Sequence, residues 1–545
     1  MKIPWRSGRA DSGFYEVREM AKRIVVIGAG PGGLASAMQL AKAGAEVTVL
    51  EAQPHVGGRC SAIEADGFRF DVGPTFFLYP RVLREIFASV GYDLDREVPM
   101  KRLDPQYRLT FGAGGMLDCT PDIAEMEKRI ANLSPKDEGA ITRYMRDNRI
   151  KLERFRPILE SPFSSLLDLI RPAVLAAAPW VRPWKSLGQE LESYFSDPRL
   201  TIAFSFQSKY LGMSPFRCPS LFSILSYLEY EYGVFHPIGG CARVSERMAE
   251  IAEELGAVIH TEEPVLGLEF DGRRVTHVRT GRDTYPVDAI VVNADFAHAM
   301  KHLVPNHLRK RWSDTKLEQK DFSCSTFMLY LGVDGTFPEL PHHNIHITTD
   351  YERNLRQIEK EGVLPDDPSF YVQNPCITDP SLAPDGQSAL YVLVPVPNLK
   401  QSSVEWNEET RQRYRSLTLK KLEAIGLHDL SERIVFEKMI TPEDWREQRS
   451  VYAGATFNLA HGLNQMLHNR PRNRFEELDG VYLVGGGTHP GSGLPVIYES
   501  SRITSKLLLP DLGMDASFLM NPEQAVRDVC GRSPAPLPAC ELTQV

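Results

Sequence analysis

The sequence predicts an α/β protein that combines a Rossmann-like nucleotide-binding domain with an inserted, discontinuous second domain. Three observations predict this fold. Residues 24–27 are a short apolar run rich in β-branched side chains, which is typical of a buried parallel strand. A glycine-rich turn and a helical pattern follow it directly. A second apolar run, residues 47–50, then ends at an acidic residue, Glu51.

The turn after the first strand has the spacing G-x-G-x-x-G. Gly28 allows the tight turn, Gly30 lets a phosphate approach the backbone, and Gly33 lets the following helix pack on the strand. Residues 34–41 place apolar side chains on one helical face, and the free amides at the start of that helix favour an anion. The predicted phosphate loop consists of Gly28, Ala29, Gly30, Pro31, Gly32 and Gly33.

Glu51, followed by Ala52, stands 18 residues past Gly33 at the end of the second strand. A carboxylate there can accept hydrogen bonds from a ribose and would repel a 2′-phosphate. A glycine-rich turn in an unrelated βαβ unit would leave this acid unexplained. The order of elements therefore predicts a dinucleotide site, and up to this point the nucleotide can be a nicotinamide or a flavin.

A second glycine pair, Gly57 and Gly58, follows with Arg59. Another loop can thus close over a pyrophosphate, whose charge Arg59 can offset. The run from G-x-G-x-x-G through the acid to G-G-R resembles the signature of the amine-oxidase-like flavoprotein superfamily. The resemblance implies that the nucleotide is FAD.

Three further segments resemble the bacterial carotenoid desaturases, which act on phytoene or on its thirty-carbon relative diapophytoene. They are residues 68–80, 205–244 and 478–508, and the resemblance extends from about residue 21 to 508. It implies an FAD-dependent desaturation by hydride transfer to the flavin. It also implies further FAD contacts at Gly73, Pro74, Thr75, Val265, Gly486, Gly487, Pro495 and Val496.

The C-terminal segment supports this interpretation without the family. Residues 481–485 read as a buried strand, and six of the nine residues 485–493 are glycine or proline. Such a backbone can approach a flat ring closely. His489 lies within this loop, and it either positions cofactor or substrate or is a hydrogen-bonded turn histidine. Residues 495–500 depart from the small-residue stretch of the family, which leaves substrate length and step number open.

The domain prediction follows from these segments. Residues 20–110, 236–300 and 475–512 form the FAD-binding domain, and residues 111–235 and 301–474 form a substrate and membrane-associating domain. Residues 1–19 are expected to be a leader, and residues 513–545, rich in proline near their end, are expected to be a flexible tail.

A polyene offers few polar handles, so burial of apolar surface must hold it. Seven aromatic residues can line an apolar passage, although ordinary core packing is the favoured interpretation of any single one: Phe204, Phe206, Tyr210, Phe222, Tyr227, Tyr230 and Phe235. Desaturation also releases a proton. The sequence assigns no catalytic residue, and the open candidates for the base are Glu229, Glu231, His236 and Glu499.

Residues 161–195 combine apolar side chains with tryptophan and basic residues, which an interfacial membrane segment needs. A buried helical pair is the alternative. The expected partners are a long apolar polyene, a peripheral membrane surface and an electron acceptor such as oxygen or a quinone. The net charge of −9 argues against nucleic acid. Scattered cysteines without metal-ligand spacing predict no metal and a reducing, cytoplasmic setting. Together with residues 161–195, the expected location is cytoplasmic and peripheral, on the inner face of the cell membrane.

Other functions remain open on sequence grounds. A carotenoid oxygenase that forms a terminal aldehyde shares the fold, as does a carotenoid isomerase that uses reduced flavin. A lipid-carrier protein that keeps FAD as a structural part is the non-enzymatic alternative, and the unbroken FAD signature argues against it.

Overall fold

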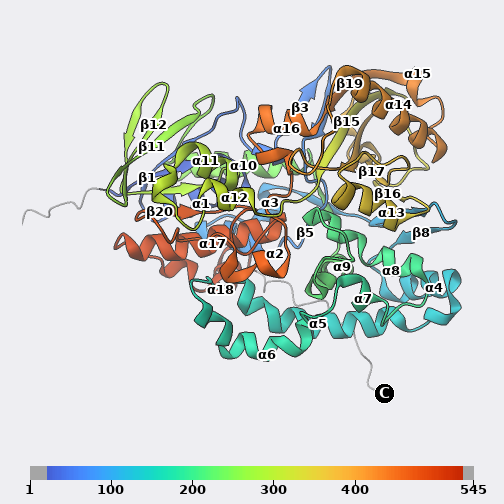
Figure 1. Ribbon diagram of the computed structural model, residues 1–545, viewed down its shortest axis with the longest axis horizontal. Coiled ribbons are helices and arrows are strands. Elements are labelled where there is room, and N and C mark those ends of the chain that lie inside the picture. The colour runs from blue at the N-terminus through green and yellow to red at the C-terminus, as the bar shows by residue number, and fades with distance from the viewer. Residues whose placement is uncertain (1–20, 532–545) are drawn as a thin grey trace, which may run out of the picture.

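The computed structural model describes residues 21–531 as two α/β halves around two large sheets. Figure 1 shows the smaller parallel sheet at one end of the molecule and the larger sheet at the other. The parallel sheet has the strand order β10-β2-β1-β14-β20. Its strands are β1 (Arg23–Ile27), β2 (Glu46–Leu50), β10 (Val258–His260), β14 (Ala289–Val292) and β20 (Val481–Leu483).

This sheet gathers strands from three distant parts of the chain. β1 pairs in parallel with β2 and with β14, so that Ile27 lies opposite Leu50 and Val292. The carboxyl ends of these strands therefore meet at one edge, where ligands bind in sheets of this kind. α1 (Pro31–Lys42), α10 (Cys241–Glu254) and α17 (Leu494–Asp511) pack together beside the sheet.

The larger sheet has seven strands in the order β19-β15-β18-β17-β16-β7-β8. Its members are β7 (Tyr107–Phe111), β8 (Met116–Cys119), β15 (Ser325–Asp334), β16 (His343–Ile347), β17 (Phe370–Gln373), β18 (Gln387–Val396) and β19 (Ile434–Ile440). The structure places residues 107–110 in this sheet, although the sequence assigned them to the nucleotide half. β7 belongs there because it pairs with β16 and β8.

The remaining strands form three small sheets. They are β3 (Ala62–Ala65) with β4 (Phe68–Asp71), β5 (Phe77–Leu78) with β9 (Val234–Pro237) and β6 (Met100–Arg102), and the antiparallel β11 (Val265–Asp271), β12 (Arg274–Thr280) and β13 (Thr284–Pro286). The β11–β12 pair is the hairpin that the Asp-Gly sequence at 271–272 predicts.

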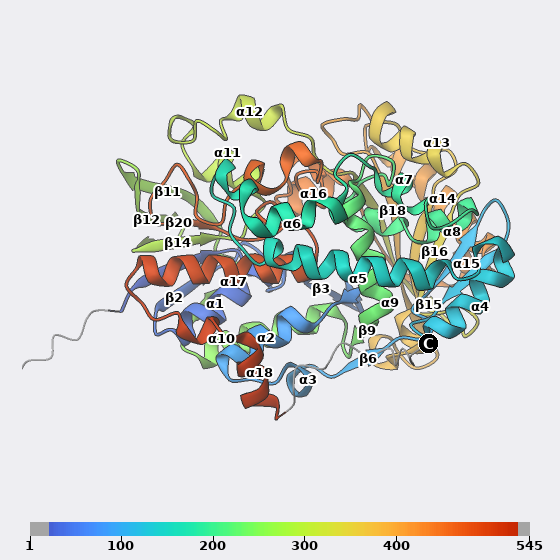
Figure 2. The same cartoon turned by 90° about the horizontal axis from the view of Figure 1, so that it is seen from below.

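The remaining helices lie around both sheets (Figure 1), and Figure 2 shows α5 crossing the molecule when it is viewed from below. They are α2 (Arg81–Val90), α3 (Leu94–Glu97), α4 (Ile123–Leu133), α5 (Ala140–Leu159), α6 (Pro172–Val181), α7 (Leu187–Leu191), α8 (Pro198–Ala203), α9 (Ile224–Tyr232), α11 (Phe296–Leu303), α12 (Asp314–Glu318), α13 (Tyr351–Arg356), α14 (Glu408–Ala424), α15 (Leu430–Arg433), α16 (Pro442–Arg449) and α18 (Pro522–Cys530).

The prediction of a flexible tail over residues 513–545 is wrong for residues 522–530. Residues 522–530 form α18, which packs against α2 and buries Val526, and Arg81 lies 3.6 Å from the carboxylate of Glu523. An amphipathic helix of nine residues was overlooked because the proline-rich end dominated the composition. The expected leader and residues 532–545 lie outside the described residues.

Candidate functional site

The first glycine loop has no space for side chains. The Cβ of an alanine at position 33 would overlap with the carbonyl oxygen of Gly28, and one at position 30 would lie 2.9 Å from Nδ2 of Asn293. Gly28 itself has a φ of +96°. Backbone amides at the start of α1 are thus the groups that the loop presents, which suits the pyrophosphate of a dinucleotide.

Asn293 is a site residue that the sequence analysis missed. Its amide donates a hydrogen bond of 3.1 Å to the carbonyl oxygen of Gly28, and it follows β14 directly. A polar residue at the end of the apolar run 289–292 was the available signal. Its importance depends on the parallel pairing of β14 with β1, because that pairing brings residue 293 next to residue 28.

Glu51 lies at the same sheet edge and is buried. Its Oε2 accepts a hydrogen bond from the amide of Ala29 at 2.8 Å, and its Oε1 accepts one from the amide of Gln53 at 2.9 Å. Burial raises the pKa of this carboxyl group, and the amide hydrogen bonds oppose the rise. The acid predicted to hold a ribose therefore contacts the phosphate loop directly.

The second glycine pair lies against the first loop. The amide of Gly57 donates to the carbonyl of Ala29 at 2.8 Å, and a Cβ at Gly58 would lie 3.5 Å from Cα of Gly30. Arg59 donates to the carbonyl of Thr456 at 2.5 Å. In this structure Arg59 thus ties the second glycine loop to the later part of the chain.

The Gly73–Thr75 segment is adjacent to this pair, because a Cβ at Gly73 would lie 2.6 Å from the carbonyl oxygen of Arg59. Two tyrosines of the seven-stranded sheet hold the segment. Tyr391 donates to the carbonyl of Gly73 at 2.8 Å, and the hydroxyl groups of Thr75 and Tyr371 are 2.8 Å apart. Both halves of the molecule therefore meet at this segment.

The C-terminal glycine loop closes the site from the other end of the chain. A Cβ at Gly32 would collide with Val484 and approach Ile497, so this loop and the start of α17 lie against the first loop. A Cβ at Gly487 would lie 2.6 Å from Oδ1 of Asn458. Gly486, Pro495 and Val496 belong to the same loop and helix start.

Arg470, which sequence reasoning also missed, shapes this loop. It is fully buried and donates hydrogen bonds to backbone carbonyl groups, including those of Gly486 at 2.6 Å and Thr488 at 3.2 Å within this loop. Burial lowers its pKa to about 9. Because its partners are backbone groups of separate segments, its own sequence context gave no signal.

His489 is a hydrogen-bonded turn histidine, the simpler of the two readings. Its Nε2 lies 2.9 Å from the carbonyl oxygen of Ser161, to which it can donate, and burial lowers its pKa to about 4. It therefore connects the C-terminal loop to the segment that follows α5.

Val265 begins β11 close to the acid. Two residues earlier, the amide of Glu263 donates to the carbonyl of Glu51 at 2.8 Å. The strand thus starts beside the predicted ribose position. Its contact with the adenine stays a prediction.

The predicted aromatic lining is divided between core and accessible positions. Phe204, Phe206, Tyr227 and Tyr230 are buried, and Phe204 stacks on both Phe195 and Tyr230. Three others keep accessible surface: Tyr210, Phe222 and Phe235. No group of three or more His, Cys, Asp or Glu side chains with metal-binding geometry occurs within residues 21–531.

The assembled loops suit FAD: two glycine loops, an acid at the strand end and a C-terminal loop with a helix start. Comparison with known proteins also supports a flavin site. A family model described as flavin containing amine oxidoreductase matches residues 31–509. A 4,4′-diapophytoene desaturase (4,4′-diapolycopene-forming) of Methylomonas sp is 42% identical over 489 residues, which cover 89% of this chain and 95% of that protein.

Further relatives and solved structures agree. The neurosporene-forming phytoene desaturase of Rhodobacter capsulatus is 36% identical, with 90% of this chain and 94% of that protein covered. An oxidoreductase from Methanosarcina mazei superposes with a TM-score of 0.59 and 18% identity, covering 88% and 98% of the two chains. Putrescine oxidase bound to putrescine gives 0.55 and 16%, covering 91% and 99%. These two structures support the fold alone.

Proposed function

Because the chain belongs to the family of flavin-containing amine oxidoreductases, we propose that it is an FAD-dependent carotenoid desaturase. It introduces carbon–carbon double bonds into a long polyisoprenoid precursor. The observation that carries the proposal is the likeness to named carotenoid desaturases along about nine tenths of the chain. Nothing among these relatives supports the oxygenase, isomerase or lipid-carrier alternatives.

In this proposal the three glycine loops, the Gly73–Thr75 segment, Glu51 and Val265 hold FAD. Gly28–Gly33 and Gly57–Arg59 receive the pyrophosphate, Glu51 receives the ribose, and Val265 lies beside the adenine. The Gly73–Thr75 segment and the loop with Gly486, Gly487, Pro495 and Val496 enclose the ring system. The bound flavin supplies a two-electron acceptor that takes a hydride from carbon. The protein must position the reacting carbon about 3–3.5 Å from that acceptor.

The relative at 42% identity is a diapophytoene desaturase, which supports the thirty-carbon precursor as the first substrate to test. Phytoene is the forty-carbon alternative, as in the relatives at 34–36% identity. An uncharged chain of this length is held by burial, which contributes about 25 cal/mol per Å² of apolar surface.

The test is anaerobic addition of diapophytoene or phytoene to the purified yellow protein. We expect the flavin absorbance to bleach and a chromatogram to show products with additional conjugated double bonds. Readmission of oxygen or addition of a quinone should restore the flavin absorbance and identify the acceptor. A protein that cannot be reconstituted with FAD, or whose flavin is reduced by neither precursor, would contradict the proposal.

We further propose that the segment 161–195 docks on the inner face of the cell membrane, where the precursor is dissolved. No helix within residues 21–531 is long and apolar enough to span a membrane. Leu166, Leu167 and Ile170 are 67%, 73% and 65% exposed, and Leu175 and Trp184 are exposed as well. Exposed apolar side chains of this size are typical of interaction surfaces.

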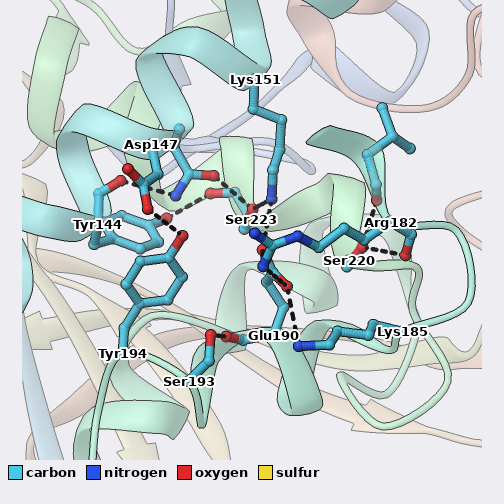
Figure 3. A network of polar contacts seen from close by, with 12 residues as sticks. Tyr144, Asp147, Lys151, Arg182, Lys185, Glu190, Ser193, Tyr194, Ser220 and Ser223 are labelled. Atoms are coloured by element: carbon cyan, nitrogen blue, oxygen red, sulfur yellow. Dashed lines mark hydrogen bonds and ion pairs between the residues drawn. The ribbon is translucent and has the colours of Figure 1, made fainter. Parts of the chain in front are cut away.

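Cations border this apolar surface. Figure 3 shows Arg182 and Lys185 converging on the buried carboxylate of Glu190, which also contacts Lys151 at 3.2 Å. The distances from Glu190 are 3.1 Å to Arg182 and 3.9 Å to Lys185. The side chains of Arg182 and Lys185 stay 37% and 34% exposed, so both cations can meet anionic headgroups beside the apolar surface.

Vesicle flotation tests the docking. The triple variant Leu166→Ser, Leu167→Ser, Ile170→Ser should lose binding to vesicles with anionic phospholipid but keep activity on substrate dispersed in detergent. A matched control replaces three exposed apolar residues elsewhere, Val258, Leu266 and Val435, with serine. Equal binding of both variants would contradict the proposed surface.

A further inference from the structure

The structure distinguishes among the four candidate bases that the sequence left open. Glu229 on α9 is fully buried and has no ion pair with any described residue. The other three have charged partners: Glu231 with Arg149 at 3.0 Å, His236 with Asp379 at 3.3 Å, and Glu499 with Arg502 at 3.4 Å. Glu229 is thus the one candidate held by neutral groups.

Three neutral donors hold the carboxyl group of Glu229. Oε2 accepts hydrogen bonds from the hydroxyl of Tyr107 at 3.0 Å and from the amide of Gln207 at 2.8 Å. Oε1 accepts one from the hydroxyl of Tyr210 at 2.8 Å. Side-chain donors from β7 and from residues 206–211 therefore fix both oxygens without a positive charge.

The other titratable groups near Glu229 are also neutral at physiological pH. They are Cys119 on β8, Tyr144 on α5 and Tyr230 on α9, and burial raises the pKa of each above its ordinary value. The same burial raises the pKa of Glu229 to about 7, and its hydrogen bonds from Gln207, Tyr210 and Tyr107 lower it by less. A carboxyl group that titrates near neutrality suits a general base.

Glu229 is close to the segment that the proposal places beside the flavin. Phe76 follows Thr75 directly, and its ring centroid lies 5.3 Å from that of Tyr210 and 6.1 Å from that of Tyr107. Tyr210 is only partly buried, although burial around its hydroxyl raises its pKa well above the usual value. Tyr210 thus connects Phe76 to Glu229, because its ring packs near Phe76 and its hydroxyl donates to Oε1 of Glu229.

We propose that Tyr210 and Glu229 form the proton acceptor of the desaturation, with Tyr210 as the residue that contacts the substrate and Glu229 as the residue that positions it and stores the proton. This inference rests on the proposed function. It also gives a role to the only uncompensated carboxyl group among the four candidates.

One carbon of the precursor loses a hydride to FAD, which supplies the oxidant. On the neighbouring carbon the C–H bond breaks, and its electron pair becomes the second bond of the new C=C. The proton goes to Oη of Tyr210 while the hydroxyl proton of Tyr210 moves to Oε1 of Glu229. The neutral carboxyl group later releases this proton to water.

The experiment measures the rate of anaerobic flavin reduction in a single turnover between pH 5.5 and 9. In the unaltered protein the rate should rise with pH through an apparent pKa near 7, because the ionised carboxylate is the active form. The variant Glu229→Gln should reduce its flavin at least about 100-fold more slowly and lose this pH dependence. Tyr210→Phe should show a comparable loss.

Glu231→Gln is the matched control, because it lies two residues away on the same helix but is paired with Arg149. We expect it to keep a rate within about threefold and an unchanged pH profile. A second readout needs no substrate: infrared difference spectra should show protonated carboxyl absorption that titrates near pH 7. Glu229→Gln should remove the part that Glu229 contributes and leave the part of Glu499, whose pKa burial also raises to about 7.

Wild-type rates and pH profile in Glu229→Gln would overturn the inference. If that variant does not fold, Tyr210→Phe and Glu229→Asp provide the decision. Retained rates in Tyr210→Phe, or a Glu229→Asp variant without any shift in the pH profile, would also overturn it. If neither precursor reduces the flavin of the unaltered protein, the proposed function fails. The infrared titration needs no substrate, so it tests the titration of Glu229 separately.

Discussion

Gly33 illustrates how one residue decides whether the nucleotide loop can form. A Cβ at this position would overlap with the carbonyl oxygen of Gly28, whereas a Cβ at Gly281 would meet only a methyl group of Leu266 at 3.9 Å. The first contact is with backbone, which cannot move aside without opening the loop. The second is ordinary van der Waals contact.

We therefore expect Gly33→Ala to weaken FAD binding at least about tenfold and to destabilise the fold by about 1–3 kcal/mol. Gly281→Ala should change neither by a measurable amount. Fluorescence titration with FAD and thermal unfolding of both variants provide the measurements, and equal FAD affinity in the two would contradict the steric argument.

The raised pKa of Glu229 also predicts how the stability of the protein depends on pH. Its pKa in the folded protein, about 7, lies above that of an unfolded glutamate. The folded state therefore binds the proton more tightly, and this group destabilises the fold progressively as the pH rises from about 4.5 to 7. Above pH 7 the full penalty is present.

The variant Glu229→Gln cannot ionise, so its unfolding free energy relative to the unaltered protein should increase with pH over this window. The increase amounts to up to about 3 kcal/mol. Denaturant unfolding at pH 5 and pH 8 measures it. A difference that is the same at both pH values would show that the carboxyl group does not titrate in this range.

At the scale of elements, the site depends on helices that begin where glycine loops end. α1 starts within the first glycine loop, at Pro31, and α17 starts directly after the C-terminal one, at Leu494, and the two helices pack against each other. The hydroxyl groups of Ser36 and Ser501 are 3.0 Å apart at this contact. The two helices thus keep the loops from opposite ends of the chain in one place.

α18 supports this arrangement from outside, because it covers α2, which in turn contacts α17. A chain that ends after residue 520 exposes the apolar surface of α2 and should lose roughly 1–3 kcal/mol of stability. A chain that ends after Gly531 keeps α18 and should unfold at nearly the temperature of the full chain. Equal unfolding temperatures in both truncations would show that α18 contributes nothing.

At the scale of the whole molecule, the proposed FAD site joins both halves. Residues 23–59, 289–293 and 481–497 surround it on one side, and Tyr371 and Tyr391 of the seven-stranded sheet hold its Gly73–Thr75 segment. A ligand that contacts segments of both halves stabilises the folded state by its binding free energy.

Removal of FAD should therefore lower the unfolding temperature of the entire chain. At a free FAD concentration about 100 times the dissociation constant, the expected stabilisation is about 2.7 kcal/mol. Thermal unfolding with and without added FAD measures it, and limited proteolysis should show faster cleavage in the apoprotein. An unfolding temperature that does not change when FAD is added would contradict a binding site that joins both halves.

The sequence by itself determined the nucleotide loops, because strand, glycines, helix and acid follow one another within about thirty residues and their spacing is a local property. It also determined the hairpin at 265–280 and, through resemblance, the cofactor. The aromatic residues of 204–235 were correctly recognised as large and apolar, but sequence could not separate core positions from accessible ones.

Only the tertiary structure decided which side chains meet across long separations. Asn293 reaches Gly28, Arg470 holds the loop at Gly486, and the donors around Glu229 include one from residue 107. Sequence ranked Glu229 and Glu231 equally, since both are acids on one helix. The fold separated them because the charged partner of Glu231 comes from α5, whereas Glu229 faces the interior, where neutral hydroxyl and amide donors surround it.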